Sequence, residues 1–322
     1  MAVYTELSFE QADRFMQALG RGRLTALQGI AEGIENTNYF ASTEQGEWVL
    51  TLFERLHFEE LPFYLHYMQH VARRGLPVAE PQADAQGRIL HRLQGRPAAL
   101  LNRLNGRHIE APDLHHIEQM GAMLARLHLA GADFAMHQPH PRGLAWWTRT
   151  VPEVLPFLDA QRATLLRDEL AFQQGLAASG AAAALPHGVI HADLFRDNVV
   201  FDDVDGEDRL SGLFDFFFAG EDCLLFDLAV CLNDWCIDQS SGHLVDEQAA
   251  AFCEAYQRLR PLSGGELRLM PALRRAAAFR FWLSRLWDLH LPRDAALLTA
   301  KDPDHFDRVL RACIATPWHP LH

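Results

Sequence analysis

The chain has 322 residues, 49% of them apolar, which is enough for one two-lobed domain or two ordinary domains with a large buried core. Its 29 lysine and arginine residues are outnumbered by 42 aspartate and glutamate residues, so the formal net charge is −13. This acidic balance argues against nucleic acid or an anionic membrane surface as the main partner.

The sequence also lacks the patterns of targeting segments and metal sites. No apolar run reaches 18 residues, and the polar residues 1–11 do not form a secretory signal peptide. The five cysteines form no Cys-x-x-Cys pair, and the seventeen histidines form no His-Glu-x-x-His pattern. We therefore expect a cytoplasmic protein with buried free thiols, while its oligomeric state stays open.

The first hundred residues are predicted to be rich in strands. Ser8 and Gln11 form a capping box ahead of a helical apolar pattern. Three strands are then expected, at residues 24–30, 39–43 and 48–53. A helix is expected over 59–74, and we interpret the run Ala98 to Leu101 as the connector to the second half of the chain.

A turn-prone stretch lies between the first two of these strands. It contains the candidate nucleotide-binding residues Gly33, Glu35, Asn36, Thr37 and Asn38. A turn of small and amide residues between two strands can cover nucleotide phosphates with its backbone N–H groups. An ordinary β-hairpin would have the same composition, so this stretch alone leaves both interpretations open.

From residue 112 the apolar pattern is mostly helical. Helices are expected from 112 to about 128, and at 164–178, 226–237, 247–259, 266–291 and 304–315. His128 is interpreted as a histidine at the edge of the core, and the alanine-rich stretch 179–185 as a mobile linker. These patterns predict an α+β fold, with a β-rich lobe over residues 1–100 and a larger, mainly helical lobe over 101–322.

The most informative stretch contains His-Ala-Asp-Leu-Phe-Arg-Asp-Asn, residues 191–198. A short apolar strand leads into it and delivers Asp193 to a loop, and Asn198 precedes the next strand. A third apolar run carries Asp215, which Phe216 follows. Phosphoryl transfer from ATP needs an aspartate that accepts the hydroxyl proton, and an asparagine and a second aspartate that hold magnesium.

The spacing of these residues is that of a kinase. The interval from Asp193 to Asn198 equals that of the protein-kinase catalytic loop, and Asp215 stands where the Asp-Phe-Gly motif would. Two acidic β-turns are the alternative, since either aspartate alone is more often a turn residue. The full combination favours the kinase. Asp227, near the start of the following helix, is interpreted as a structural acid that ties the loop together.

The order of elements and the segments 191–198 and 213–220 resemble the aminoglycoside phosphotransferase and choline kinase superfamily, which shares the protein-kinase fold. More narrowly, five segments resemble the Pseudomonas-type homoserine kinase family: 33–40, 48–54, 191–198, 227–236 and 300–303. The resemblance covers essentially the whole chain. It implies a two-lobed, protein-kinase-like fold, with a small antiparallel β lobe that carries one main helix and a larger helical lobe.

The resemblance also implies an activity. The family transfers the γ-phosphate of ATP to the side-chain hydroxyl of L-homoserine, which gives O-phospho-L-homoserine for threonine biosynthesis. Asp193 would be the base, Asn198 and Asp215 would hold Mg²⁺, and the 33–38 loop would cover the phosphates. The acceptor's charged groups need opposite charges. Asp234, Arg280 and Arg285 are the candidates.

One departure from the kinase pattern is plain. Thr51 stands where kinases carry a phosphate-binding lysine in the third strand, and Lys301 is the only lysine of the chain. Either Arg55 or another arginine of that lobe reaches the phosphates, although a guanidinium does not copy an ammonium point charge, or magnesium carries more of the charge. Two alternatives follow: a related kinase for an aminoglycoside, choline or methylthioribose, and a pseudokinase that only binds nucleotides.

Overall fold

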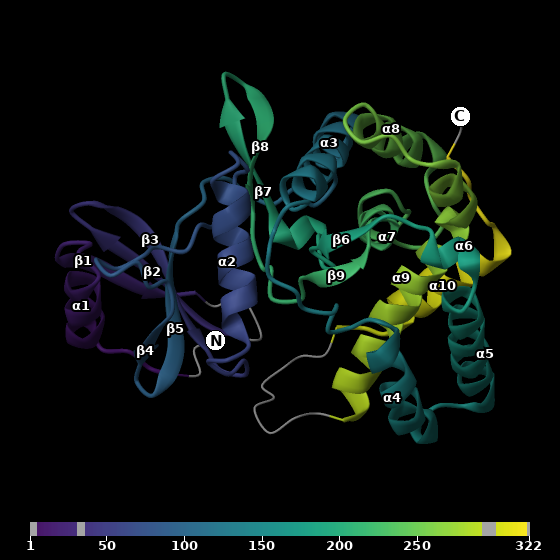
Figure 1. Ribbon diagram of the computed structural model, residues 1–322, viewed down its shortest axis with the longest axis horizontal. Helices are drawn as coiled ribbons and strands as arrows, with labels where there is room; N and C mark the ends of the chain where they lie inside the picture. The colour runs from purple at the N-terminus through teal and green to yellow at the C-terminus, as the bar shows by residue number, and fades with distance from the viewer. Residues whose placement is uncertain (1–4, 31–35, 292–300, 321–322) are drawn as a thin grey trace. The chain divides into compact units, whose positions relative to one another are not determined.

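The structure is a computed structural model that describes residues 5–30, 36–291 and 301–320. The chain forms two compact units (Figure 1). The first comprises Met1–Asn105 with Gly212–Phe214, and the second comprises Gly106–Ser211 with Asp215–His322. The strand-rich first unit and the mainly helical second unit confirm the predicted α+β class.

The first unit is built on a five-stranded antiparallel sheet with the strand order β1-β2-β3-β5-β4. Its strands are β1 (Leu24–Gly29), β2 (Asn36–Thr43), β3 (Gly46–Phe53), β4 (His91–Leu93) and β5 (Arg96–Asn102). Its helices are α1 (Phe9–Ala18) and α2 (Leu61–Ala72), which flank the sheet on opposite sides (Figure 1).

The packing of α1 on the sheet follows from its apolar face. The predicted capping box of Ser8 and Gln11 is confirmed at the start of this helix. Phe15 and Met16 are buried in one cluster with apolar side chains of β3, such as Leu50. Along β2 buried and half-buried residues alternate, because successive side chains of a strand point to opposite faces.

Two predictions about the first unit were wrong. Ala98 to Leu101 is not a connector but the buried middle of β5, which pairs with β3 and β4. A short apolar run fits a strand covered on both faces as well as it fits a linker, and tertiary packing decided between them. Asn36 to Asn38 belong to β2 instead of a turn, while Gly33 and Glu35 lie outside the described residues.

The second unit carries most of the helices. They are α3 (Leu114–Ala130), α4 (Leu144–Val154), α5 (Ala160–Ala177), α6 (Gly180–Ala183), α7 (Leu224–Trp235), α8 (Asp246–Gln257), α9 (Gly264–His290) and α10 (Asp304–Ala315). Its short 3-10 helices are η1 (Leu155–Phe157) and η2 (Arg196–Asn198). Two small sheets pair β6 (His187–Ile190) with β9 (Gly220–Cys223), and β7 (Val199–Val204) with β8 (Glu207–Leu213).

Helix α7 lies at the centre of this unit. Every one of its residues except Asp234 is buried, as expected for a helix that is apolar on all sides. It packs against α9, which in turn packs against α10, and α3 packs against α8 (Figure 1). The segment 179–185, predicted to be a mobile linker, instead contains α6, whose first turn is capped by Ser179. Alanine's high helix propensity favours this outcome.

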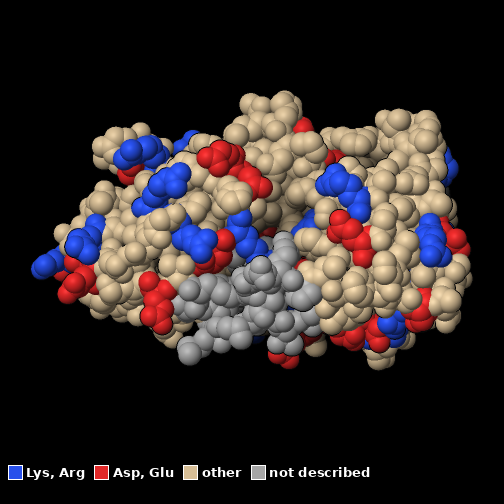
Figure 2. Space-filling model, turned by 90° about the horizontal axis from the view of Figure 1, so that it is seen from below, with Lys and Arg blue, Asp and Glu red and all other residues tan. Residues whose placement is uncertain are grey.

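In Figure 2, acidic and basic side chains lie interspersed on the face that is drawn, a distribution typical of a solvated surface. None of the helices within residues 5–30, 36–291 and 301–320 combines the length and hydropathy that crossing a bilayer requires.

Candidate active site

The loop after β6 has an unusual backbone conformation. Ala192 has a φ of 66° and Asp215 a φ of 61°, in the left-handed region that side chains other than glycine rarely adopt. Backbone strain of this kind persists only where surrounding contacts hold it, and it is found most often at functional sites. Both residues belong to the segments that the sequence singled out.

Asp227 holds the first of these strained segments in place. Its carboxylate accepts hydrogen bonds from the backbone N–H groups of His191 and Ala192, both at 2.8 Å. Asp227 lies in the first turn of α7 and is fully buried. The prediction that this acid ties the loop together is confirmed.

A buried histidine completes the environment of Asp227. His128 of α3 places Nε2 3.1 Å from the Asp227 carboxylate and Nδ1 2.7 Å from the Tyr256 hydroxyl. Burial by itself would raise the pKa of Asp227, but His128 and the loop hydrogen bonds hold its pKa below the usual value. His128 is therefore part of the core, as predicted, with a partner on each ring nitrogen.

One face of α7 provides the remaining anchors of the loop. Trp235 Nε1 donates to the carbonyl oxygen of Leu194 at 3.0 Å, and Asp234 accepts the backbone N–H of Arg196 at 2.8 Å. Asp227 and Asp234 are seven residues apart, which puts them two helical turns apart on the same face. A rigid, buried helix thus holds the loop at three points along its length.

Asp234 also binds the side chain of Arg196. Its Oδ2 lies 3.2 Å from Arg196 Nε, and only 12% of the Asp234 side chain is exposed. Burial raises the pKa of Asp234, and the adjacent Arg196 opposes this rise. The sequence predicted Asp234 as a ligand of the substrate, whereas here its carboxylate is engaged by the loop itself.

The candidate base and the candidate metal ligand of the loop lie in contact. Asn198 Nδ2 donates to the backbone carbonyl of Asp193 at 2.7 Å, and lies 3.4 Å from its Oδ2. Because the amide nitrogen is used in this way, the amide oxygen of Asn198 is the atom that could bind a cation.

An aromatic contact joins this loop to the segment that carries Asp215. The rings of His191 and Phe216 are tilted against each other with their centroids 4.4 Å apart, and both residues are fully buried. Asp193 follows His191 by two residues, and Asp215 directly precedes Phe216. The two carboxylates therefore extend from one packed core.

Two arginines of α9 lie near acidic residues of the loop. Arg280 is 3% exposed, lies over the ring of Phe281 at 3.7 Å, and places Nη1 3.5 Å from Asp193 Oδ1. Arg285 donates to the backbone carbonyl of Asp302 at 2.8 Å. Burial lowers the pKa of Arg285, which nearby carboxylates counteract, and an arginine stays charged in any case.

The sequence prediction missed the contact between Lys301 and the loop. Its Nζ lies 2.8 Å from Oδ2 of Asp197, in the middle of the loop. The nearby His305 adds no charge near neutral pH, because burial lowers its pKa to about 4. That Lys301 is the chain's single lysine was visible in the sequence, but its partner lies 104 residues away and only the fold brings the two together.

The donor atoms of the loop fit Mg²⁺ better than a metal held entirely by protein. No group of three histidine, cysteine, aspartate or glutamate residues suited to a metal is found within the described residues. Mg²⁺ in nucleotide enzymes takes one or two carboxylates, water and substrate phosphates. Asp215 carries a carboxylate and Asn198 an amide oxygen, which are the kinds of hard oxygen donor that Mg²⁺ accepts.

In the first unit, the described candidates for phosphate contact are engaged in the sheet. The Thr37 hydroxyl donates to Glu54 at 2.6 Å and accepts the N–H of Thr5 at 3.1 Å. Asn38 pairs with Thr51 across β2 and β3, and its side-chain oxygen accepts the Thr51 hydroxyl at 2.7 Å. The residue at the expected lysine position is thus buried and hydrogen-bonded to a strand neighbour.

Comparison with known proteins shows the family of the chain. A family model described as the phosphotransferase enzyme family, APH, matches residues 26–262. The chain belongs to this family. It is 58% identical over 318 residues to the homoserine kinase of Polaromonas naphthalenivorans (strain CJ2), covering 99% of each chain. It is 50% identical over 319 residues to that of Cupriavidus pinatubonensis (strain JMP 134 / LMG 1197), covering 98% of this chain and 97% of the relative.

Solved structures of other phosphotransferases show the same fold. An amicoumacin kinase in complex with AMP-PNP, Ca²⁺ and Ami aligns with a TM-score of 0.71 over 96% of this chain and 92% of its own, at 14% identity. Spectinomycin phosphotransferase with ADP and spectinomycin aligns with a TM-score of 0.66 over 97% and 99%, at 12% identity. The predicted protein-kinase-like fold of a phosphotransferase is thereby confirmed.

Proposed function

We propose that this phosphotransferase is a homoserine kinase, which transfers the γ-phosphate of ATP to the side-chain hydroxyl of L-homoserine and so supplies threonine biosynthesis. The identity of 58% to a homoserine kinase, over 99% of both chains, is the observation that carries the proposal. The match extends over nearly the full length of both chains and so covers both units, which supports the same acceptor.

Asp193 is proposed as the base of the reaction. It lies in a strained loop that Asp227 and Asp234 of α7 hold through hydrogen bonds to its backbone. A carboxylate positioned in this way can accept the hydroxyl proton as the phosphorus–oxygen bond forms. Asn198 orients it through the contact to its backbone carbonyl. The hydroxyl oxygen then attacks the γ-phosphorus, and the bond to the leaving ADP oxygen breaks.

Asn198 and Asp215 are proposed to hold Mg²⁺. When bound, the ion would neutralise charge on the phosphates that the reaction moves. The residues Gly33 to Asn38 are proposed to approach the nucleotide. Asn36, Thr37 and Asn38 could do so from the start of β2, where the described part of this stretch begins.

The charged ends of the amino-acid acceptor need opposite charges in the second unit. Arg280 and Arg285 are proposed for its carboxylate, because both guanidinium groups lie among the acids around Asp193. Asp234 fits the ammonium group less well, since its carboxylate already binds the backbone and side chain of Arg196. We assign to Asp234 the positioning of the loop.

A cytoplasmic location is also proposed. All five cysteines are buried and free, and free thiols are typical of proteins in reducing compartments.

The proposal is tested by ADP release with MgATP over a panel of acceptors: L-homoserine, L-serine, choline, methylthioribose and an aminoglycoside. L-Homoserine is expected to give the highest kcat/KM. Asp193→Asn should lower kcat by roughly 10²–10⁴-fold, the usual contribution of a positioned base. Asp203→Asn is the matched control, because Asp203 lies exposed near the end of β7. A preference for another acceptor, or a normal rate in Asp193→Asn, would reject the corresponding assignment.

A further inference from the structure

The only lysine of the chain is bound to the middle of the candidate catalytic loop. Lys301 Nζ lies 2.8 Å from Oδ2 of Asp197, and Asp197 sits between the arginine that Asp234 holds and the candidate metal ligand Asn198. The ion pair joins two segments that are 104 residues apart in sequence. It therefore brings an ammonium group next to the residues that would surround the transferred phosphoryl group.

Three cations make ion pairs at this loop in the described part of the chain, and they differ in how firmly they are held. Arg196 is 22% exposed and bound to Asp234 through its side chain. Arg280 is 3% exposed and packed against Phe281. Lys301, by contrast, is 53% exposed, and its partner Asp197 is 58% exposed. Lys301 is thus the cation of this set that can change partners at the least cost.

The chemistry of the side chain fits that role. An ion pair between two exposed groups contributes little to stability, so breaking it costs little. A lysine ammonium is a point charge on a flexible four-carbon stem, and it can bind a phosphate without the fixed geometry of a guanidinium. A lysine ammonium can therefore move from a carboxylate to a phosphoryl oxygen when the phosphoryl group carries more negative charge than the carboxylate.

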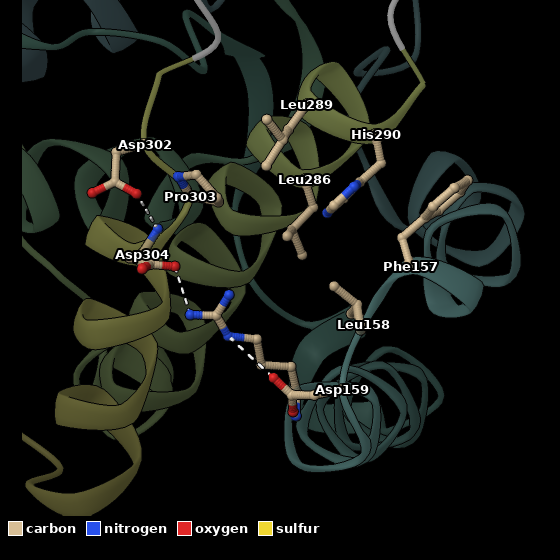
Figure 3. A pocket seen from close by; sticks show the side chains of 10 residues that line it. Phe157, Leu158, Asp159, Leu286, Leu289, His290, Asp302, Pro303 and Asp304 are labelled. Atoms are coloured by element: carbon tan, nitrogen blue, oxygen red, sulfur yellow. Dashed lines mark hydrogen bonds and ion pairs between the residues drawn. The ribbon is translucent and has the colours of Figure 1, made fainter.

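The backbone beneath Lys301 is, in contrast, well fixed. The carbonyl oxygen of Asp302 accepts a hydrogen bond from Arg285 at 2.8 Å, and its side chain accepts the N–H of Asp304 at 2.9 Å. Asp304 in turn binds Arg162 of α5 at 2.6 Å (Figure 3). This segment forms one wall of a pocket that is also lined by the end of α9, by η1 and by the start of α5. A main chain held by these hydrogen bonds and a long, flexible lysine stem can deliver the ammonium charge to one place repeatedly.

We propose that Lys301 is a catalytic residue that leaves Asp197 to bind the transferring phosphoryl group and neutralise the charge it develops. The inference deepens the proposed kinase function and rests on it. It also accounts for the lysine-free first unit, in which Thr51 is buried and bonded to Asn38. Asp197 would be the resting partner that keeps the ammonium close to the loop between turnovers.

The test compares the two halves of the ion pair. Lys301→Met removes the ammonium, and Asp197→Asn removes its partner but keeps the ammonium. If Lys301 acts on the phosphoryl group, Lys301→Met should lower kcat about 10²-fold, the usual loss for one donor that stabilises a transition state. Asp197→Asn should lower kcat by a clearly smaller factor than Lys301→Met, and Lys301→Arg should recover part of the loss. The KM for L-homoserine should be unchanged in Lys301→Met.

Two results would overturn the proposal. Equal losses in Lys301→Met and Asp197→Asn would mean that the pair acts only as a tie, and no loss in Lys301→Met would mean that the ammonium is not used. Thermal unfolding of both variants serves as the control for folding, and the melting temperatures should match wild type because the pair is exposed.

A second measurement separates this inference from the choice of acceptor. Pyridoxal phosphate with borohydride labels lysine amines, and the peptide that contains Lys301 is unique in the chain. MgATP should protect Lys301 from labelling in wild-type protein, and labelling that MgATP leaves unchanged would count against phosphate binding. If wild type phosphorylates an acceptor other than L-homoserine, the proposed function fails while protection by MgATP still supports Lys301.

Discussion

Replacing Asp227 by asparagine is the perturbation for which the structure gives the clearest magnitude. The carboxylate accepts two backbone hydrogen bonds, from His191 and Ala192, and faces His128 Nε2. The side chains of Asp227 and His128 are both fully buried. Asparagine has the same shape, so the substitution changes hydrogen bonding and charge without opening a cavity.

The expected loss of stability follows from the donors that remain. An asparagine has one acceptor oxygen for two backbone N–H groups, and its amide turns a donor toward the second. An unsatisfied buried donor costs about 1–3 kcal/mol. Removing one partner of a buried ionic network costs about 3–5 kcal/mol in total. We therefore expect Asp227→Asn to lose about 3 kcal/mol of unfolding free energy, and much of its activity because Ala192 relaxes.

Urea unfolding followed by tryptophan fluorescence and circular dichroism measures this loss. The midpoint should fall while the slope stays the same, because the compactness of the native state is retained. Asp203→Asn, which alters an exposed acceptor of one backbone N–H, should change the stability by less than about 0.5 kcal/mol. A midpoint for Asp227→Asn within error of wild type would refute the role of this acid as the anchor of the loop.

The stability difference between wild type and Asp227→Asn is also expected to depend on pH. The pKa of Asp227 is lowered in the folded state, so its ionised form stabilises the protein above the unfolded-state pKa. That stability is lost as the pH falls through the lower, folded-state pKa. The stability difference between wild type and Asp227→Asn should therefore be full near neutrality and shrink in strong acid. A difference that grows with acidification would contradict this sign.

Further predictions concern packing and thiol reactivity. A methyl group at Gly121 of α3 would meet the carbonyl oxygen of Phe252 of α8 at 2.3 Å, so Gly121→Ala should lower the stability by about 1–3 kcal/mol in urea unfolding. Gly175→Ala in α5 meets nothing within 4 Å and should raise it by about 0.5–1 kcal/mol; the opposite order would argue against the α3–α8 contact. Burial raises the pKa of Cys223 and Cys253 to about 12. The native protein should accordingly react slowly with a thiol reagent at pH 8, and all five cysteines should react in denaturant; rapid stoichiometric labelling of native protein would contradict their burial.

Much of the candidate site could be predicted from local patterns. The interval from Asp193 to Asn198, the position of Asp215 and the capping box of α1 depend on residues that are neighbours in sequence, and for these the prediction needed no knowledge of the fold. Helical periodicity also predicted α10 with its observed bounds. A pattern of this kind is decided by the chain's own geometry, because spacing along a helix or a loop sets which side chains share a face.

The remaining features depend on contacts between distant segments, and only the tertiary structure decided them. Ala98 to Leu101 is a strand because β3 pairs with all of its residues on one side, and β4 pairs with Ala98 on the other. Asp234 positions the loop because α7 places it beside Arg196. Lys301 meets Asp197 because α9 and α10 pack on the loop through aromatic side chains against Phe195. The physical reason is the same in each case. The residue type sets the chemistry of a side chain and can be read from the sequence. The packing of the whole chain determines which distant residue that side chain contacts.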